Sequence, residues 1–436
     1  MNTTAIIGLG ITGLSCLRYL YGREHVVVLD TRVEPPNAAA AQGEFPDADY
    51  RFGADGYDFA EVDRVIASPG VDLGNCLITA ARDAGVEIAS DIDLFCEAAQ
   101  APITAITGTN GKSTVTSLVG HLQRALGLSP GVGGNLGDAA LDLLDDAADS
   151  YVIELSSFQL ERLAPHRFQA ATILNVSEDH LDRHGTMADY GESKQRVYRD
   201  CDLAVANRAD SMTLPTTQVG RLITFGLDAP GLEDWGLVDG SLCRGGERLV
   251  AADELPIAGR HNVANVLAAF ALVWRDGGDN EALADAARSF IGLPHRCQRV
   301  AELGGVSYVN DSKATNVGAT IAALQGLGDA AVPRLVLIAG GEGKDADFSP
   351  LKEVVGQLVK HVVLLGADAD LIERALASVV PVSRARSMSD AVVKAQDAAL
   401  PGDLVVLSPA CASFDMFENF SERGERFAAA VQELAA

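Results

Sequence analysis

The sequence is poor in positive charge. Of its 436 residues, 34 are Lys or Arg and 60 are Asp or Glu, which gives a formal net charge of −26. A strongly acidic surface repels nucleic acid and anionic membranes, so we expect neither as the main partner. Any anionic substrate must then bind in local basic pockets.

Paired cysteines and long apolar runs are also missing. The seven cysteines are scattered without a CxxC pair, and their odd number favours reduced thiols over a disulfide framework. There is no run of about 18 apolar residues, and no basic segment precedes the first apolar residues. We therefore expect a cytoplasmic protein without membrane insertion.

Apolar residues make up 48% of the sequence and charged residues 22%, which is typical of a globular protein. A prior of about 150 residues per domain suggests three domains. We place them at residues 1–92, 93–292 and 293–436. Strands alternate with helices in all three, which predicts an α/β fold of mostly parallel sheets with flanking helices.

Apolar runs bounded by turn residues predict the main strands of each domain. Residues 226–256 are rich in Gly and Asp and predict hairpins, and a helix is expected from about Asn262 to Trp274. The predicted strands are Ala5–Leu9, Val26–Asp30, Arg64–Ala67, Ile103–Ile106, Tyr151–Leu155, Ala171–Val176, Leu203–Asn207, Val306–Asn310, Arg334–Ala339, His361–Leu365 and Leu404–Leu407.

The segment Thr107–Thr114, TGTNGKST, lies between a predicted strand and a helix-like segment. A Gly-rich turn there directs backbone N–H groups and the positive end of the helix dipole at one point, which suits a phosphate. Lys112 adds a cation, and Ser113 or Thr114 a hydroxyl for Mg²⁺. The usual P-loop would have Gly at position 106, where this chain has Ile, so the loop is a shortened variant. An ordinary strand–turn–helix connection would not need Gly, Gly, Lys and Ser together.

The pattern Gly8-x-Gly10-x-x-Gly13 follows the first strand, and Asp30 ends the second. This is the dinucleotide fingerprint, in which the acid binds a ribose hydroxyl. The pattern predicts a tight turn near a phosphate-bearing ligand without naming that ligand. With a triphosphate loop downstream, we favour a nucleotide-linked substrate over NAD. Glycines that serve only helix–strand packing are the alternative.

Three polar side chains of the central domain are candidate metal ligands or neighbours. Glu154 ends an apolar strand near the phosphate loop, where a carboxylate can hold Mg²⁺. His180 follows another strand and could face the same crevice, although an isolated His is more often structural. Lys194, taken alone, is interpreted as a surface lysine.

Polar loops follow three strands of the last domain, at residues 310–316, 340–345 and 408–415. Ligands of open α/β sheets bind at the carboxyl ends of strands. We therefore expect one site that contains Lys313, Lys344 and Ser413. Two lysines in so acidic a chain predict an anionic co-substrate, whereas solvated turns are the alternative.

Several of these motifs together resemble the Mur ligases, ATP-dependent amino-acid ligases of bacterial cell-wall synthesis. The resemblance spans essentially the whole chain. Its first motifs are the phosphate loop, the Glu154 strand and the segments 175–180, 259–265 and 294–296. Segments 310–316 and 408–420 look like the branch of the family that adds D-glutamate.

The resemblance implies a Rossmann-like first domain that binds UDP rather than NAD, a P-loop-type central ATPase and a Rossmann-like C-terminal domain. The implied UDP-substrate residues are Leu9, Ile11, Thr12, Asp30, Thr31, Arg32, Gly70 and Asn135. The implied ATP-binding residues are Gly108, Thr109, Asn110, Gly111, Lys112, Ser113, Thr114, Asn262, Asn265, Arg296, Asp311 and Lys313.

The family also implies two Mg²⁺ ions and a carbamylated Lys194, because a carbamate turns the amine into an anionic oxygen ligand. The implied metal ligands are Ser113, Glu154, His180 and Lys194, and the implied catalytic residues are Lys112, His180 and Lys194. The implied D-glutamate residues are Thr315, Lys344, Ser413 and Phe420.

The implied reaction is ATP-dependent addition of D-glutamate to UDP-N-acetylmuramoyl-L-alanine through an acyl phosphate, in peptidoglycan precursor synthesis. The implied partners are these three small molecules, and we expect a monomer. A related amide ligase that uses a different amino acid is the nearest alternative. An NAD(P)-dependent oxidoreductase and a P-loop transport ATPase are more distant ones, because neither explains the loops of the third domain.

Overall fold

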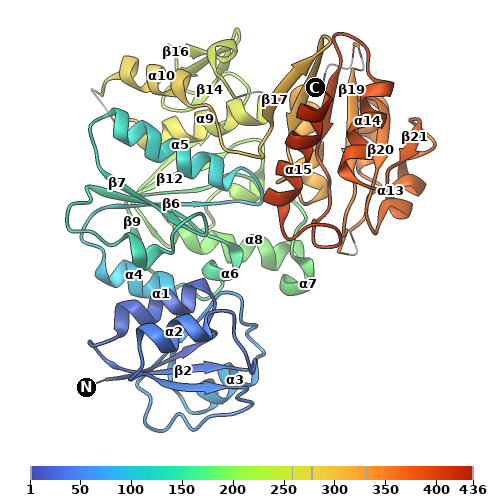
Figure 1. Cartoon of the computed structure of the whole chain (residues 1–436). Coiled ribbons are helices and arrows are strands. Elements are labelled where there is room, and N and C mark those ends of the chain that lie inside the picture. Colours follow the sequence, from blue (N-terminus) through green and yellow to red (C-terminus); the bar gives the residue numbers. More distant parts are fainter. Residues whose placement is uncertain are drawn as a thin grey trace.

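The computed structural model describes residues 2–257, 259–275, 278–328, 331–332, 334–344 and 346–434. Three main sheets follow one another along the chain, each flanked by helices (Figure 1). The predicted α/β class with mostly parallel sheets is confirmed. Asp345, part of a predicted loop, lies outside the described residues.

The N-terminal sheet has five parallel strands in the order β3-β2-β1-β4-β5. Because the order reverses between β1 and β4, a crevice opens at the carboxyl ends of these strands. The first strand was expected to reach Leu9 but ends at Ile7, because Gly8 has φ +95° and begins the turn. The elements are β1 (Thr3–Ile7), α1 (Ile11–Leu20), β2 (His25–Asp30), α2 (Ala38–Glu44), β3 (Asp49–Phe52), β4 (Arg64–Ala67), α3 (Cys76–Asp83) and β5 (Glu87–Ala89).

The central sheet has nine strands in the order β16-β15-β14-β13-β12-β10-β6-β8-β7. The strands from β7 to β14 are parallel to their neighbours, and β14 to β16 form the predicted hairpins. The strands are β6 (Ile103–Thr107), β7 (Pro130–Gly134), β8 (Ser150–Glu154), β10 (Ala170–Ile173), β12 (Leu203–Asn207), β13 (Arg221–Phe225), β14 (Trp235–Val238), β15 (Ser241–Arg244) and β16 (Glu247–Ala251), with β9 (Arg167–Phe168) and β11 (Asp200–Cys201) as a separate pair.

Helices cover both faces of the central sheet. The helices α5, α9 and α10 share one buried cluster with it, and α4, α6 and α8 contribute to another on the opposite face. The bounds are α4 (Asp91–Ala98), α5 (Lys112–Ala125), α6 (Ser157–Leu160), α7 (Leu181–His184), α8 (Met187–Gln195), α9 (Arg260–Val273) and α10 (Asn280–Ser289).

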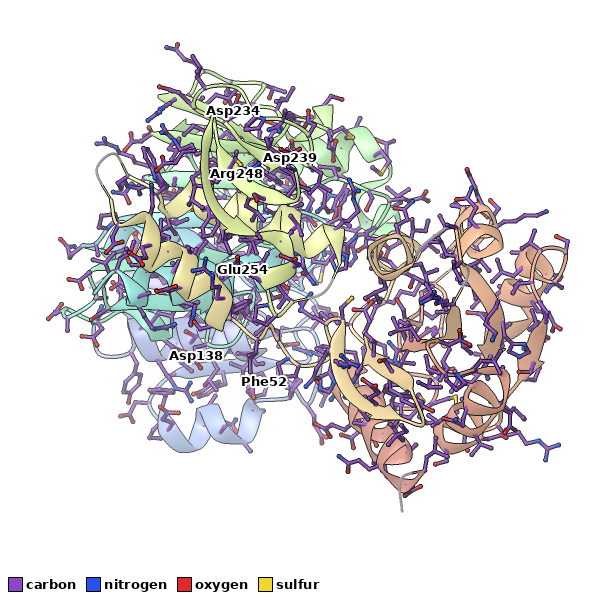
Figure 2. All side chains as sticks on the ribbon, turned by 90° about the horizontal axis from the view of Figure 1, so that it is seen from above. Phe52, Asp138, Asp234, Asp239, Arg248 and Glu254 are labelled. Atoms are coloured by element: carbon purple, nitrogen blue, oxygen red, sulfur yellow. The ribbon has the colours of Figure 1, made fainter. Side chains whose placement is uncertain are left out.

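Charged side chains protect the exposed end of this sheet. Arg248 on the edge strand β16 pairs at 3.0 Å with Asp239 in the turn between β14 and β15, and both are exposed (Figure 2). Charges on an edge strand disfavour pairing with a second chain.

The C-terminal sheet has the order β17-β18-β22-β19-β20-β21, and only β17 is antiparallel among the described strands. Apolar clusters fill both of its faces. The elements are β17 (Gln298–Leu303), β18 (Val306–Asn310), α11 (Val317–Leu327), β19 (Leu335–Ala339), α12 (Leu351–Leu358), β20 (Val359–Leu364), α13 (Ala369–Leu376), β21 (Val382–Arg384), α14 (Met388–Ala398), β22 (Leu404–Leu407) and α15 (Phe420–Glu433).

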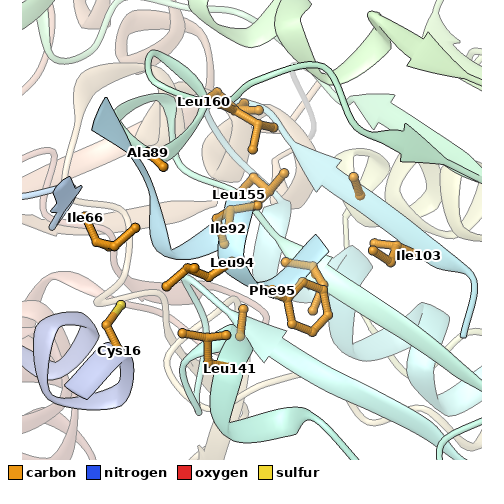
Figure 3. Close-up of a cluster of buried hydrophobic side chains, with 14 of the residues drawn as sticks. Cys16, Ile66, Ala89, Ile92, Leu94, Phe95, Ile103, Leu141, Leu155 and Leu160 are labelled. Carbon is orange, nitrogen blue, oxygen red and sulfur yellow. The ribbon is translucent and has the colours of Figure 1, made fainter. Parts of the chain in front are cut away.

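Helix α4 joins the first two sheets into one core. Ser90 caps it through a capping box with Asp93, and Ile92 and Phe95 are fully buried. The Phe95 ring lies edge-on to Tyr151 of the central sheet at 5.1 Å, in a cluster that also contains Cys16 of α1 (Figure 3). The predicted boundary between residues 92 and 93 falls inside this helix, and the domain limits stay predictions. Among the described helices, none combines the length and apolarity needed to cross a bilayer.

Truncation of Phe95 tests this shared core. Phe95→Ala removes a buried ring from between two sheets, so we expect the free energy of unfolding to fall by about 3–5 kcal/mol. Leu232→Ala, at a side chain that is 92% exposed, is the control and should stay within about 0.5 kcal/mol. Urea unfolding followed by circular dichroism measures both, and equal midpoints would contradict the role of α4.

Candidate active site

The phosphate loop connects β6 to α5 through two glycines with positive φ. Gly108 has φ +152° and Gly111 has φ +84°. A Cβ at Gly111 would lie 2.6 Å from Oδ1 of Asn265, so any other residue there would push the Asn265 side chain away. The side chain of Asn175 fixes the loop from the other side, because it accepts from the Asn110 N–H at 2.8 Å and donates to the Asn110 carbonyl at 3.0 Å.

Two lysine amines converge on this loop. Lys112 donates to the carbonyls of Gly108 and Thr109 at 2.9 and 2.7 Å, and Lys194 donates to the Gly108 carbonyl at 3.0 Å. The interpretation of Lys194 as a surface residue is wrong, since only 1% of it is exposed. Burial, together with the nearby charge of Lys112, lowers the pKa of Lys194 well below its ordinary value.

Glu154 ends β8 beside the loop and has one unused oxygen. Its Oε1 accepts from Asn135 at 2.7 Å, whereas its buried Oε2 has no hydrogen-bond partner among the described residues. A buried carboxylate oxygen without a partner suits a hard cation. Within the part of the chain that the structure describes, no three His, Cys, Asp or Glu side chains form a metal cage. A single carboxylate beside a phosphate loop fits Mg²⁺, which takes one or two carboxylates together with phosphates and water.

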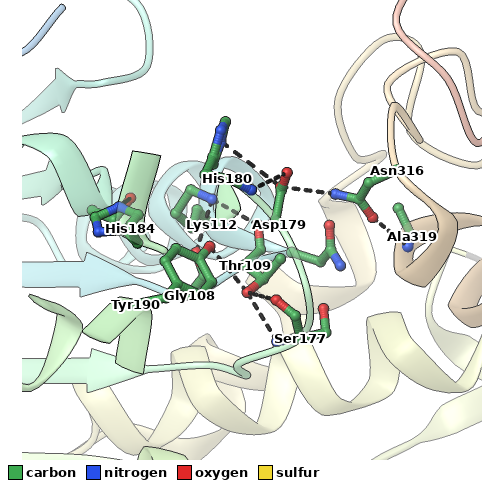
Figure 4. A network of polar contacts seen from close by, with 12 residues as sticks. Gly108, Thr109, Lys112, Ser177, Asp179, His180, His184, Tyr190, Asn316 and Ala319 are labelled. Atoms are coloured by element: carbon green, nitrogen blue, oxygen red, sulfur yellow. Dashed lines mark hydrogen bonds and ion pairs between the residues drawn. The ribbon is translucent and has the colours of Figure 1, made fainter. Parts of the chain in front are cut away.

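His180 lies at the start of α7, with φ +53° and its side chain 41% exposed. Its ring lies 4.9 Å from that of Phe158, and its Nε2 is 3.8 Å from the Asp179 carboxylate. Burial lowers the pKa of His180 below its ordinary value, which favours the neutral form that binds metals. Figure 4 shows His180 and Asp179 beside the loop, with Thr109 hydrogen-bonded to Ser177 and to Tyr190.

A cavity of about 670 Å³ contains the phosphate loop and extends to the third domain. Hydrogen bonds join the two domains here, from Arg296 Nη2 to Ser113 Oγ at 2.7 Å and from Asn316 Nδ2 to Asp179 Oδ2 at 3.0 Å. The third-domain residues in the lining include Lys313, Thr315 and Phe420, and the Lys313 amine lies 3.9 Å from the Phe420 ring centre. Residues from both domains thus share one cavity.

A second cavity, of about 530 Å³, adjoins the same loop. Burial raises the pKa of Asp311 to about 6, while its oxygens accept from Ser408 Oγ at 2.9 Å and Cys297 N–H at 3.1 Å. This cavity brings together the five ATP-binding residues predicted outside the loop, which are Asn262, Asn265, Arg296, Asp311 and Lys313.

The three polar loops of the third domain lie side by side, and the single site expected to contain Lys313, Lys344 and Ser413 stays a prediction. A short bridge pairs Glu342 with Ala412. Arg423, which the sequence did not single out, donates to Ser312 and to the carbonyls of Cys411 and Ala412 from within α15. Its position three residues after Phe420 carried no signal that the side chain turns inward.

The predicted D-glutamate residues divide into two pairs. Thr315 and Phe420 line the 670 Å³ cavity. Lys344 is exposed and Ser413 is buried, and neither is part of that lining.

A separate pocket of about 410 Å³ lies at the crevice of the N-terminal sheet. Although burial opposes its ionisation, hydrogen bonds from Arg32 and from the Leu9 N–H hold the pKa of Asp30 below its ordinary value. Leu9 is fully buried, and Asn135 lies in the 670 Å³ cavity instead. The predicted residues that do line this pocket are Ile11, Thr12, Asp30, Thr31, Arg32 and Gly70.

Three family models match successive parts of the chain. Residues 2–90 match the Mur ligase MurD-like N-terminal domain, residues 106–273 the Mur ligase middle domain, and residues 295–411 the Mur ligase glutamate ligase domain. Among solved structures, UDP-N-acetylmuramate-alanine ligase from Thermotoga maritima has a TM-score of 0.61 at 21% identity and covers 100% of both chains, which shows a common fold.

Curated relatives match almost the full length. The chain is 47% identical over 441 residues to the UDP-N-acetylmuramoylalanine--D-glutamate ligase of Marinobacter nauticus, with 99% of this chain and 98% of the relative covered. The enzyme of that name from Pseudomonas aeruginosa is 47% identical over 437 residues, with the same coverage. The resemblance seen in the motifs is confirmed, and the chain belongs to the Mur ligase family.

Proposed function

We propose that this chain is an ATP-dependent ligase that joins D-glutamate to UDP-N-acetylmuramoyl-L-alanine in peptidoglycan precursor synthesis. The names of its full-length relatives support this substrate pair. The structural feature that most supports this proposal is the 670 Å³ cavity, because the phosphate loop, Glu154 and third-domain residues all line it. The relatives give no support to the oxidoreductase alternative.

The proposed reaction has two steps. The alanine carboxylate of the nucleotide substrate attacks the γ-phosphorus of ATP, and the bond to ADP breaks to give an acyl phosphate. The amine of D-glutamate then attacks the acyl carbon, phosphate leaves, and the amine releases a proton. The first step joins two anions, so catalysis consists mainly of charge neutralisation and positioning.

The cations around the cavity suit that first step. Lys112 and the loop N–H groups would hold the phosphates of ATP, with Gly108, Thr109, Asn110, Gly111, Ser113 and Thr114 around them. The second cavity would take the nucleoside, next to Asn262, Asn265, Arg296, Asp311 and Lys313. Burial lowers the pKa of Lys313 to about 8, so its amine stays mostly cationic at neutral pH.

Two Mg²⁺ ions would be held by Ser113, Glu154, His180 and a carbamylated Lys194. When bound, the metal neutralises phosphate charge. The free oxygen of Glu154 and the neutral tendency of His180 support this assignment. A carbamate forms from CO₂ and a neutral amine, and the lowered pKa of Lys194 increases the neutral fraction.

The remaining assignments follow the other cavities. The pocket of the N-terminal sheet would hold the UDP moiety through Ile11, Thr12, Asp30, Thr31, Arg32 and Gly70, with Leu9 fixing Asp30 and with Asn135 near the reacting end. Thr315, Lys344, Ser413 and Phe420 would bind D-glutamate. We also propose domains at residues 1–92, 93–292 and 293–436, and a cytoplasmic monomer.

Phosphate release tests the proposed reaction directly. With ATP and Mg²⁺, we expect release only when UDP-N-acetylmuramoyl-L-alanine and D-glutamate are both present, because the amine must trap the acyl phosphate. L-glutamate serves as the control and should give no turnover. Turnover with another amino acid would change the branch of the family, and release independent of the nucleotide substrate would refute the ligase.

Glu154→Gln tests the metal assignment. The amide keeps the shape and the contact to Asn135 but loses the charge, so we expect kcat to fall by about 10²–10³. The Mg²⁺ concentration needed for half-maximal activity should rise at the same time. Glu247→Gln, on the exposed edge strand β16, is the matched control. An unchanged Mg²⁺ requirement would remove Glu154 from the metal site.

Lys194→Ala tests the carbamate. We expect activity to fall at least about 100-fold, since an oxygen ligand to the metal is lost. Acetate should restore part of the activity because its carboxylate can replace the carbamate oxygens. Lys394→Ala, on the surface of α14, should behave like wild type. Full activity of the Lys194 variant, or an absence of rescue by small carboxylates, would contradict the assignment.

A further inference from the structure

Two arginines of the central domain, Arg162 and Arg183, donate hydrogen bonds to a loop of the N-terminal domain. Arg162 donates through Nη1 to the Ser68 carbonyl at 2.9 Å and through Nη2 to the Val71 carbonyl. Arg183 donates to the same Val71 carbonyl at 3.1 Å, and its Nε lies 3.8 Å from the Asp72 carboxylate. We call this pair the arginine clamp.

The clamped loop, residues 68–72, is a wall of the 410 Å³ pocket assigned above to UDP. Ser68 Oγ donates to the carbonyl of Gly8 at 2.7 Å. Val71 packs so closely on the Gly-rich turn that a Cβ at Gly8 would lie 2.7 Å from Val71 Cγ2. The arginine clamp therefore fixes the wall and, through it, the turn that faces the nucleotide.

The clamp is largely buried, and its two carboxylate neighbours, Glu161 and Asp72, pair mainly with Arg183. The Arg162 side chain is 2% exposed, and its Nε has no hydrogen-bond partner among the described residues. Both arginines share Glu161, which lies 3.6 Å from Arg162 Nη2 and accepts a hydrogen bond from Arg183. A buried, incompletely paired charge is weak evidence for stability, so a role in positioning fits it better.

Arg183 also reaches the metal-side residues. Its guanidinium carbon lies 4.7 Å above the Phe158 ring, and the His180 ring lies 4.9 Å from that same ring. His184, in the same helix, stacks on Phe158 at 5.6 Å and contacts Ser157 Oγ at 3.0 Å. The Phe158 ring thus lies between His180 and Arg183, the residue that contacts the wall of the nucleotide pocket.

We propose that Arg162 and Arg183 are positioning residues: both shape the nucleotide pocket through loop 68–72, and Arg183 in addition couples its occupancy to the placement of His180. This inference rests on the proposed function, which assigns UDP to the pocket and metal to His180. By linkage, if the bound nucleotide raises the affinity for metal through Arg183, bound metal raises the affinity for the nucleotide by the same factor.

Steady-state kinetics separates the two arginines. Loss of a charge-assisted hydrogen bond predicts that Arg162→Gln raises KM for the UDP-linked substrate about tenfold, with the Mg²⁺ requirement unchanged. Arg183→Gln should raise the same KM and also the Mg²⁺ concentration for half-maximal activity, by about fivefold or more. KM for ATP at saturating Mg²⁺ should stay constant in both. Arg167→Gln, which breaks an exposed pair with Asp202 on the same domain, is the control.

Thermal unfolding in the presence of UDP gives a second test, which does not require ligase activity. UDP alone should raise the Tm of the wild type and of Arg167→Gln. The increase should be much smaller for Arg162→Gln and Arg183→Gln. A UDP effect of this pattern without ligase activity would refute the proposed function and leave the clamp intact. Equal shifts in all variants, no shift in the wild type, or an unchanged Mg²⁺ requirement in Arg183→Gln would overturn the inference. If a Gln variant fails to fold, Arg162→Lys and Arg183→Lys, which retain the charge, should give smaller changes in the same direction.

Discussion

Two lysine amines from separate helices donate to one carbonyl oxygen, that of Gly108. This contact is possible because the glycines of the loop adopt a backbone that other residues rarely reach. It places Lys112 and Lys194 close enough for the charge of one to lower the pKa of the other. Glu154 lies near enough to oppose this effect electrostatically at both amines. One backbone conformation therefore brings both buried amines into the range of the same carboxylate.

The acidic surface gives these few cations greater importance. With a net charge of −26, the chain as a whole repels polyanions such as ATP. ATP must therefore be attracted by cations close to it, in a buried site where solvent screens their charge less. Lys112, Arg296 and Lys313 reach the same cavity from two domains. Domain contact and anion binding are thus linked, because the Arg296–Ser113 hydrogen bond joins the halves of this basic lining.

The fold was largely predictable because buried parallel strands appear as continuous apolar runs. β4, β12, β18 and β22 have the predicted bounds. The phosphate loop and Glu154 could be singled out because they follow strand ends, whereas the five nucleotide residues that share one cavity came from the family resemblance, and their roles stay predictions. The burial of Lys194 and the inward direction of the Arg423 side chain could not be predicted, because each depends on a helix packing against loops distant in sequence. The position of Asn135 beside Glu154 likewise required the neighbouring strand β7, which the sequence did not reveal.

Helix α4 has a consequence for how such chains can recombine. The N-terminal family model ends at residue 90 and the middle model begins at residue 106, so α4 belongs to neither. Yet Ile92 and Phe95 pack into a cluster that includes residues of both sheets. A chimera that exchanged the first module between two relatives would therefore split a hydrophobic interface whichever side of α4 the joint took. Exchange of whole modules at this junction requires compensating changes in α1 and around Tyr151.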